Sequence, residues 1–190
     1  MFQTANLIPK KLCVMTIFVT VWLVLGLTAH ADGLISEIQL YHGTSKSVSV
    51  PSTTPDESPE VDQTANSVHL SLGYLSNSLF LGGLYSIRSD VTSDVRSRGV
   101  GFGAGIGYFF ENGIRMRAFY RFNEEYGDFT SGDGVSADLG IWGRFYRNIS
   151  IGLVIHHATI HYARNSSPTI TGGWTANSTY PMLSVGYHFQ

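Results

Sequence analysis

The sequence predicts an all-β protein: an eight-stranded antiparallel transmembrane β-barrel with short periplasmic turns and longer extracellular loops. Three observations lead to this fold class. Glycine stands at every second position from Gly99 to Gly107, and strands have a period of two whereas helices do not. Apolar residues recur with the same period in about eight segments near the length of a tilted membrane strand. The connections between these segments are alternately short and long, as at the two rims of an outer-membrane barrel.

An export signal is predicted at residues 1–31, ahead of the barrel. Lys10 and Lys11 come before a long apolar run, and the Ala-His-Ala sequence at 29–31 supplies the small residues that signal peptidase requires. The alternative is an uncleaved membrane helix, because the apolar run is close to the minimum length for spanning a bilayer. Cleavage would leave residues 32–190 as a single barrel domain.

Composition excludes several classes of function. The 190 residues carry a net charge of −2 and no cluster of basic residues, so nucleic-acid binding is not expected. The single cysteine, Cys13, lies within the predicted signal, so neither a disulfide nor thiol chemistry is expected in the barrel domain. The chain has no phosphate-binding loop and no nucleophile motif of soluble enzymes. We expect neither a cofactor nor a metal.

The first three predicted strands cover residues 34–43, 68–75 and 79–88. In the first strand, Ile38 and Leu40 lie on one face while Glu37 and Gln39 lie on the other. The second and third strands alternate apolar with small or polar residues, and the turn Asn77-Ser78 joins them as a hairpin.

The fourth strand, Gly99–Phe110, has glycines on one face and apolar residues on the other. Glycine in a strand interior is destabilising, so this pattern predicts that bulky groups lie against the glycine face or that the strand bends sharply. The interior of a small closed barrel supplies both conditions. An Asn-Gly turn at Glu111–Gly113 then leads into the fifth strand, Ile114–Glu125.

The fifth strand carries a charged face. Arg115, Arg117 and Arg121 are in phase with one another and out of phase with the apolar residues of the same strand. A polar lumen accommodates such a face. We expect the glycines at 101, 103, 105 and 107 to make room for these arginines and for Trp142.

The last three strands are predicted at residues 135–146, 149–163 and 180–190, with a short turn at Arg147-Asn148 between the first two. Their outward residues are again apolar. The sixth strand turns Asp138, Trp142 and Arg144 toward the lumen.

Outward aromatic residues gather near the two rims, as the interfacial girdles of a membrane barrel require. Those expected near the short-turn rim are Tyr74, Tyr108, Phe110, Phe145, Tyr187 and Phe189. Those expected toward the other rim are Tyr85, Tyr120 and Phe122. A soluble lipocalin-like barrel has the same periodicity with its apolar face inside, and the in-phase arginines argue against it.

Four long connections, expected at the extracellular rim, cover residues 44–66, 89–97, 126–134 and 164–177. Loops on a rigid scaffold often carry function, so we expect any extracellular ligand to bind here. The longest, 44–66, is rich in Ser, Thr, Pro and acidic residues and cannot bury itself. It is either a ligand-binding loop or a variable surface segment without a dedicated ligand.

The mature chain resembles the small outer-membrane barrels of the OmpA/OmpX and Ail/opacity-protein type. The similar features are the export signal, the glycine-rich strand, the loop alternation and the closing LSVGYHF at 183–189. The resemblance implies an integral outer-membrane protein of a Gram-negative type cell, inserted by the barrel-assembly machinery and surrounded by outer-membrane lipid and lipopolysaccharide. In that family the last strand usually ends on an aromatic residue, whereas here Phe189 is penultimate and Gln190 is last.

The function that this resemblance implies is non-enzymatic. The barrel would be a scaffold whose extracellular loops serve surface binding, adhesion or envelope integrity. Two alternatives are kept: a small-solute pore and a lipid A deacylase.

The pore alternative depends on how the inward-facing arginines are used. They either form a cationic lumen that passes or binds anions, or form ion pairs with Glu37, Asp138 and Glu125 in a barrel too narrow to conduct. We favour the ion pairs because unpaired charge inside would be costly. Pairing about the loop 126–134 predicts that Arg121 lies close to Asp138. The arginines concerned are Arg88, Arg115, Arg117, Arg121 and Arg144.

The deacylase alternative rests on His157 and Thr159, which share the outward face of the seventh strand. They are similar to the His-x-Ser pair of PagL-type lipid A deacylases, and this resemblance would make His157 the base and Thr159 the nucleophile. Threonine replaces serine, and no Asp or Glu follows residue 160 to orient the histidine as a triad requires. We therefore favour an interfacial polar patch. His157 and His161 are too far apart on a strand to share a metal ion without other ligands.

Overall fold

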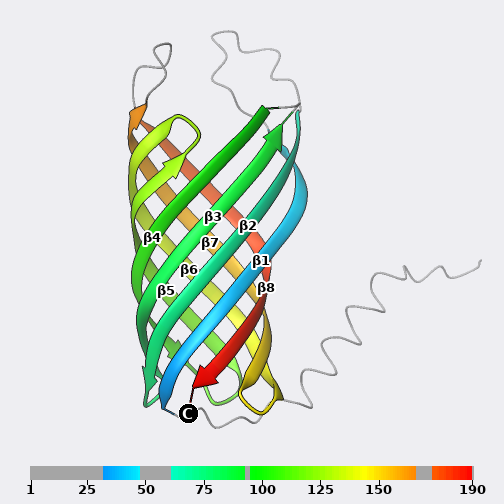
Figure 1. Cartoon of the computed structure of the whole chain (residues 1–190), viewed down its shortest axis with the longest axis vertical. Coiled ribbons are helices and arrows are strands. Elements are labelled where there is room, and N and C mark those ends of the chain that lie inside the picture. Colours follow the sequence, from blue (N-terminus) through cyan, green and yellow to red (C-terminus); the bar gives the residue numbers. More distant parts are fainter. Residues whose placement is uncertain (1–31, 48–60, 93–94, 166–172, 190) are drawn as a thin grey trace, which may run out of the picture.

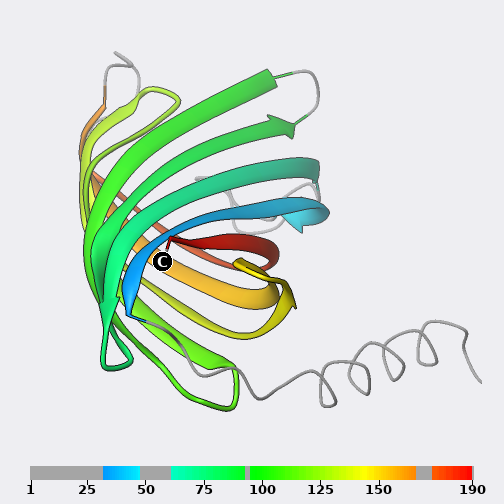
Figure 2. The same cartoon turned by 60° about the horizontal axis from the view of Figure 1, so that its bottom comes forward.

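The protein forms a closed antiparallel barrel of eight strands, seen from two sides in Figures 1 and 2. This computed structural model describes residues 32–47, 61–92, 95–165 and 173–189. Each strand pairs with its neighbours in sequence, and β8 closes the barrel against β1. The strands are β1 (Gly33–Ser47), β2 (Val61–Ser76), β3 (Leu79–Thr92), β4 (Val95–Phe109), β5 (Ile114–Tyr126), β6 (Phe129–Tyr146), β7 (Ile149–Asn165) and β8 (Trp174–Phe189). The predicted fold class is confirmed.

The register of the strands determines their tilt. One row of paired residues can be followed around the wall from Ser36 on β1 through Gly83 and Tyr120 to Asn177 on β8. Ser36 itself pairs with Tyr187, ten residues beyond Asn177. Such a stagger across eight strands corresponds to a tilt of about 40° from the barrel axis. The diagonal course of the front strands is visible in Figure 1.

The three predicted short turns all lie at the end of the barrel where the C-terminus is found (Figure 1). Asn77 and Ser78 both have positive φ, at 48° and 69°, and Gly113 has φ of 85°. Asn and Gly adopt this left-handed region at the least cost. Arg147, with φ of 43°, begins the third turn. The predicted turns at this rim are confirmed.

At the opposite end the strands run further than predicted. Most of the predicted loop 89–97 is strand, because β3 continues to Thr92 and β4 begins at Val95. The predicted loop 126–134 shrinks to a turn at 127–128, since β6 begins at Phe129. The alternation of apolar residues ends where a strand leaves the bilayer. The backbone hydrogen bonds between strands continue into water, so the strands are longer than this alternation predicts.

The other two predicted loops are also shortened. Residues 44–47 and 61–66 of the predicted loop 44–66 belong to β1 and β2. The strands β7 and β8 extend into the predicted loop 164–177 as far as Asn165 and from Trp174. The centres of these loops, at 48–60 and 166–172, lie outside the described residues, as does the predicted export signal at 1–31. Among the described residues no helix is long and apolar enough to cross a membrane.

Burial is inverted relative to a soluble barrel. The outward side chains of Leu81 and Ile106 are 67% and 65% exposed, while Arg117 and Asp138 are 3% and 2% exposed inside the lumen. A soluble barrel has its apolar residues inside. An apolar outer wall around a polar interior is the arrangement of a barrel that spans a membrane.

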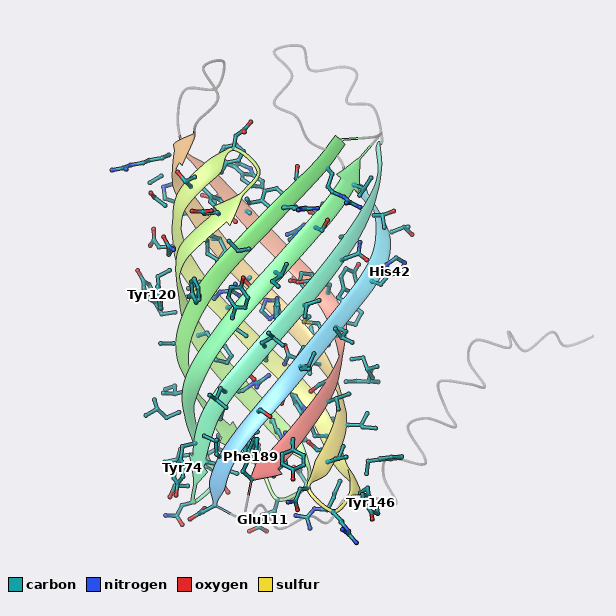
Figure 3. The ribbon with its side chains drawn as sticks, in the orientation of Figure 1. His42, Tyr74, Glu111, Tyr120, Tyr146 and Phe189 are labelled. Atoms are coloured by element: carbon teal, nitrogen blue, oxygen red, sulfur yellow. The ribbon has the colours of Figure 1, made fainter. Side chains whose placement is uncertain are left out.

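Exposed aromatic residues border the apolar outer wall at both ends. Figure 3 shows Tyr74, Tyr146 and Phe189 near the short-turn end, whereas Tyr120 lies further up the barrel. On β4 and its following turn, Phe102 and Phe110 are separated by eight positions. This spacing is about 20 Å along the axis for strands tilted by about 40°, close to the height of about 25 Å that the apolar band of a membrane barrel requires.

Candidate functional site

Arg117 forms hydrogen bonds across the centre of the lumen. Its Nη2 donates hydrogen bonds to Glu37 Oε1 at 2.8 Å and to Asp138 Oδ2 at 2.7 Å. Its Nη1 donates to Ser71 Oγ at 3.1 Å. Asp138 lies on the neighbouring strand β6, whereas Glu37 and Ser71 lie on β1 and β2. One buried guanidinium therefore joins two sides of the barrel across its interior.

Further buried side chains extend this cluster, which we call the lumen network. Gln39 Nε2 donates to Glu37 Oε1 at 2.8 Å and to Asp138 Oδ2 at 3.1 Å. His156 Nδ1 lies 2.6 Å from the other oxygen, Asp138 Oδ1. Arg115 lies 3.7 Å from Glu37 Oε2, with its guanidinium 4.9 Å from the centre of the Trp142 ring. The network consists of Glu37, Gln39, Ser71, Arg115, Arg117, Asp138 and His156.

The sequence placed Arg121 beside Asp138, and this assignment is wrong. Arg121 pairs in register with Gly134, and it is Arg117 that faces Asp138. The hairpin turns at 127–128 rather than near the middle of the predicted loop, which displaces the pairing by four residues. Arg121 instead contacts Ser86 and forms an ion pair with Glu124.

Glu124, rather than the predicted Glu125, is the acid on the inner face of β5. The pairing of β5 with β6 is irregular between Arg121 and Glu124, and Asn123 has a positive φ of 53°. This β-bulge reverses the alternation of the side chains that follow it. Glu124 is buried and Glu125 is exposed as a result.

Two other arginines that are predicted to face the lumen lie away from its centre. Arg144 is exposed near the short-turn rim, where the pairing of β6 with β7 is irregular between Arg144 and Tyr146. Arg144 pairs in register with the buried Ser150 and thus keeps the inward phase of β6, at the solvent-exposed edge of the lumen. Arg88 lies toward the opposite rim, where its Nη2 is 2.7 Å from Asp90 Oδ2.

Apolar side chains fill the lumen on both sides of the network. Toward the short-turn rim a buried cluster consists of Ile35, Leu75, Phe80, Leu84, Phe109 and Phe119. Toward the opposite rim, Ala158, Ile160 and Tyr162 are buried against Tyr126, Phe129 and Ala176. Trp174 stacks on Tyr162 with ring centres 5.6 Å apart. The lumen of the described barrel is therefore filled by side chains rather than open.

Bulky side chains lie against the glycine face of β4, as predicted, but two of these side chains are not the predicted ones. A Cβ at Gly107 would lie 2.6 Å from Arg117 Cγ, and one at Gly103 would lie 3.1 Å from Arg121 Cδ. The space at Gly101 is taken by Glu124, and that at Gly105 by Phe119.

Trp142 and Arg115 do not lie against the glycines of β4 but pack elsewhere in the lumen. A Cβ at Gly152 would lie 2.6 Å from Trp142 Cδ1, and one at Gly140 would lie 2.7 Å from Trp142 Cζ3. The indole nitrogen of Trp142 donates to Ser184 Oγ at 2.8 Å. Arg115 lies over the ring of Phe109, 4.5 Å from its centre.

The outer wall carries a second polar group, the β7–β8 ladder. It consists of three cross-strand pairs: His157 with Thr179, Thr159 with Asn177, and His161 with Thr175. Their side chains are hydrogen-bonded at 2.7, 2.7 and 3.0 Å respectively. The ladder begins directly beyond Ile155, an exposed apolar residue on the same face.

This geometry does not join His157 to Thr159 as a base and a nucleophile. The Thr159 hydroxyl donates its proton to Asn177 Oδ1, and His157 Nδ1 bonds to Thr179 Oγ1. Asp133, on the neighbouring strand, pairs in register with His161 rather than with His157. Among the described residues no group of three His, Cys, Asp or Glu side chains could hold a metal ion.

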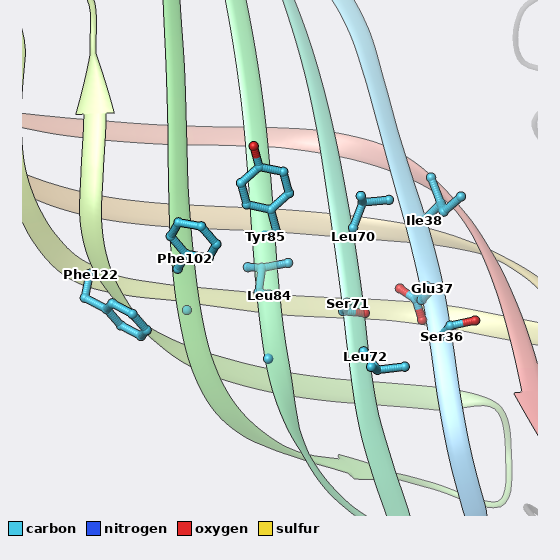
Figure 4. A pocket seen from close by; sticks show the side chains of 12 residues that line it. Ser36, Glu37, Ile38, Leu70, Ser71, Leu72, Leu84, Tyr85, Phe102 and Phe122 are labelled. Carbon is cyan, nitrogen blue, oxygen red and sulfur yellow. The ribbon is translucent and has the colours of Figure 1, made fainter.

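The outer wall of β1–β5 also contains a hollow of about 560 Å³ (Figure 4). It lies on the far side of the wall from the lumen network, and no motif in the sequence pointed to it. The residues that line it are Ser36, Glu37, Ile38, Leu70, Ser71, Leu72, Gly83, Leu84, Tyr85, Phe102, Gly103 and Phe122.

Comparison with known proteins shows similarity to solved structures only. No protein-family model matches the chain, and no curated protein sequence matches it. The in-vitro folded trimer form of the outer membrane protein OmpT from Vibrio cholerae has a TM-score of 0.40 at 15% identity, over 85% of this chain and 54% of that chain. A second in-vitro folded OmpT structure has a TM-score of 0.39 at 14% identity, over 85% and 53%. The outer-membrane expressed OmpT has a TM-score of 0.36 at 13% identity, over 81% and 52%.

The chain thus spans about half the length of these OmpT structures. The resemblance to the OmpA/OmpX, Ail/opacity-protein and PagL types stays a prediction. The apolar outer wall, the aromatic borders and the polar filled interior are those of a small outer-membrane β-barrel.

Proposed function

We propose that the protein is a non-enzymatic scaffold of the outer membrane whose extracellular loops mediate adhesion, surface binding or envelope integrity. The observation that carries this proposal is the filled lumen. Arg117 forms ion pairs with Glu37 and Asp138 across the centre of the barrel. A barrel of eight strands is just wide enough for its interior to be filled in this way.

The filled lumen argues against the pore alternative. The central charges are paired with one another rather than arranged to receive a passing anion. Apolar clusters lie on both sides of them along the axis. A permeating solute would have to displace both a buried ion-pair network and packed aromatic rings.

The end of the barrel opposite the short turns supports a role at the cell surface. There the strands continue beyond the apolar outer wall and carry exposed polar side chains such as His161, Arg164 and Thr175. A rigid barrel that extends polar strands into water is suited to hold loops in position. The proposal includes export through residues 1–31, insertion by the barrel-assembly machinery and contact with outer-membrane lipid and lipopolysaccharide.

Conductance measurements test the scaffold against the pore. The purified protein is inserted into planar lipid bilayers, with insertion verified by a heat-modifiable gel shift. We expect no stepwise conductance from the unaltered protein. An Arg117→Ala, Phe119→Ala variant, in which the central guanidinium and an adjoining ring are removed, serves as the positive comparison. Stepwise conductance from the unaltered protein would contradict the proposal.

A further inference from the structure

Gly83, which is exposed on β3, is one of the outward residues that line the hollow in the outer wall shown in Figure 4. Gly83 pairs with Leu72 on one side and with Ala104 on the other. In the next outward row along the same strands, Tyr85 and Phe102 have much larger side chains than Gly83 and Ala104. The wall therefore has a low floor at Gly83 bordered by bulky apolar side chains.

Packing within the barrel does not require a glycine at position 83. The adjacent Gly82 faces the lumen, and a Cβ there would lie 2.5 Å from Leu72 O and 2.7 Å from Gly73 Cα. At Gly83 the nearest atom to such a Cβ is Gly103 O at 3.6 Å, an ordinary contact, and its φ is not positive. Glycine in a strand interior is destabilising. The open space above Gly83 is therefore maintained at a cost that the fold itself does not explain.

The chemistry of the hollow is apolar. Its outward lining includes Ile38, Leu70, Leu72, Phe102 and Phe122, all at least 40% exposed. The charged and hydroxyl side chains of Glu37 and Ser71, which also border it, turn into the lumen and bind Arg117. The hollow thus presents no charge to a ligand that approaches from outside.

We infer that this hollow binds an acyl chain of a membrane lipid. The inference rests on the proposed location of the barrel in the outer membrane, where the apolar outer wall faces hydrocarbon. Phe102 and Phe122 border the hollow and also belong to the exposed aromatic residues toward the extracellular end. A chain from the outer leaflet would pass these rings and lie on the Gly83 floor.

A second copy of the barrel is a less suitable occupant. A stable protein interface needs roughly 20–30 residues on each side, whereas 12 residues line the hollow, some of them through their backbone only. A concave surface of this size matches one flexible chain.

Photochemical labelling tests the inference directly. The protein is reconstituted in phosphatidylcholine vesicles that contain a phosphatidylcholine with a photoactivatable group on its acyl chain, and adducts are located by mass spectrometry. We expect several-fold more adducts on Leu70, Leu72 and Phe102 than on Leu139 and Leu153, which are equally outward on the opposite wall. An even distribution would overturn the inference.

Two matched variants sharpen this result. Gly83→Leu fills the hollow from outside, and we expect it to remove the excess labelling. Ala137→Leu adds the same side chain to an exposed outward position on β6 and should leave the excess unchanged. Excess labelling that persists in Gly83→Leu would overturn the inference. Labelling of the hollow that is weaker than that of Leu139 and Leu153 would also overturn it, because a second copy of the barrel seated there would exclude lipid. Insertion into the vesicles is measured first and tests the proposed function separately.

Discussion

His156 and His157 are neighbours in sequence and lie on opposite sides of the barrel wall. His156 is 1% exposed and its Nδ1 lies 2.6 Å from Asp138 Oδ1 in the lumen network. His157 is exposed, and its Nδ1 lies 2.7 Å from Thr179 Oγ1 in the β7–β8 ladder. The two hydrogen bonds have nearly the same length, so length does not distinguish them.

Burial distinguishes them. Removing one partner of a buried hydrogen bond leaves the other without solvent, whereas water replaces a lost partner at the surface. The lumen network therefore contributes far more to stability than the ladder does. The β7–β8 ladder should accordingly tolerate substitution better than the lumen network, and the four predictions below follow this difference from its largest expected effect to its smallest.

Replacing Arg117 should have the largest effect. Arg117→Met retains much of the side-chain volume but leaves Glu37 and Asp138 buried with an uncompensated charge. We expect a loss of about 3–5 kcal/mol in the free energy of unfolding, measured by urea titration in lipid vesicles. Arg144→Met, at an exposed arginine, is the control and should change stability by about 0.5 kcal/mol or less. Equal losses would show that the lumen network does not hold the barrel together.

The two neighbouring histidines provide the most direct comparison. His156→Ala removes the partner of Asp138 Oδ1, and hydrogen bonds to charged groups contribute about 1.5–3 kcal/mol. His157→Ala removes an exposed bond and should cost about 0.5 kcal/mol or less. The same urea titration measures both. A loss in His157→Ala as large as that in His156→Ala would refute the contrast between the two surfaces.

The two faces of β4 can be compared by adding bulk. Gly103→Leu would push into Arg121 Cδ and Tyr120 O, which lie 3.1 and 3.2 Å from the new Cβ. Overpacking of this kind costs about 1–3 kcal/mol. Ala104→Leu extends into the bilayer and should cost much less. The fraction of heat-modifiable barrel recovered on refolding measures the difference, and equal yields would mean that the glycine face is not filled.

The smallest expected effect concerns the deacylase alternative. Since His157 and Thr159 each bond to β8 rather than to one another, we expect purified protein to release no acyl chain from lipopolysaccharide. The acyl chains on lipid A should also be the same in cells with and without the protein. Acyl release that is abolished by His157→Ala would revive the enzyme and displace the scaffold proposal.

The extent to which the fold could be predicted follows from the physics of alternation. In the bilayer the outward residues are apolar, so the alternation of apolar residues in the sequence predicts the strands. Beyond the bilayer both faces meet water, and the strand ends at Thr92 and Tyr126 therefore carried no such signal. Period two places Gly83 on the outward face, but it does not show how much open space the neighbouring side chains leave above this glycine, so the hollow could not be predicted.

The sequence by itself determined which residues lie on the same side of each strand, because successive side chains point to opposite faces. It placed Arg115, Arg117 and Arg121 together on the basis of spacing alone. Only the tertiary structure decided which acid each arginine meets. That choice depends on where the β5–β6 hairpin turns and on the bulge at Asn123, and a shift of a few residues in either exchanges every partner across the lumen.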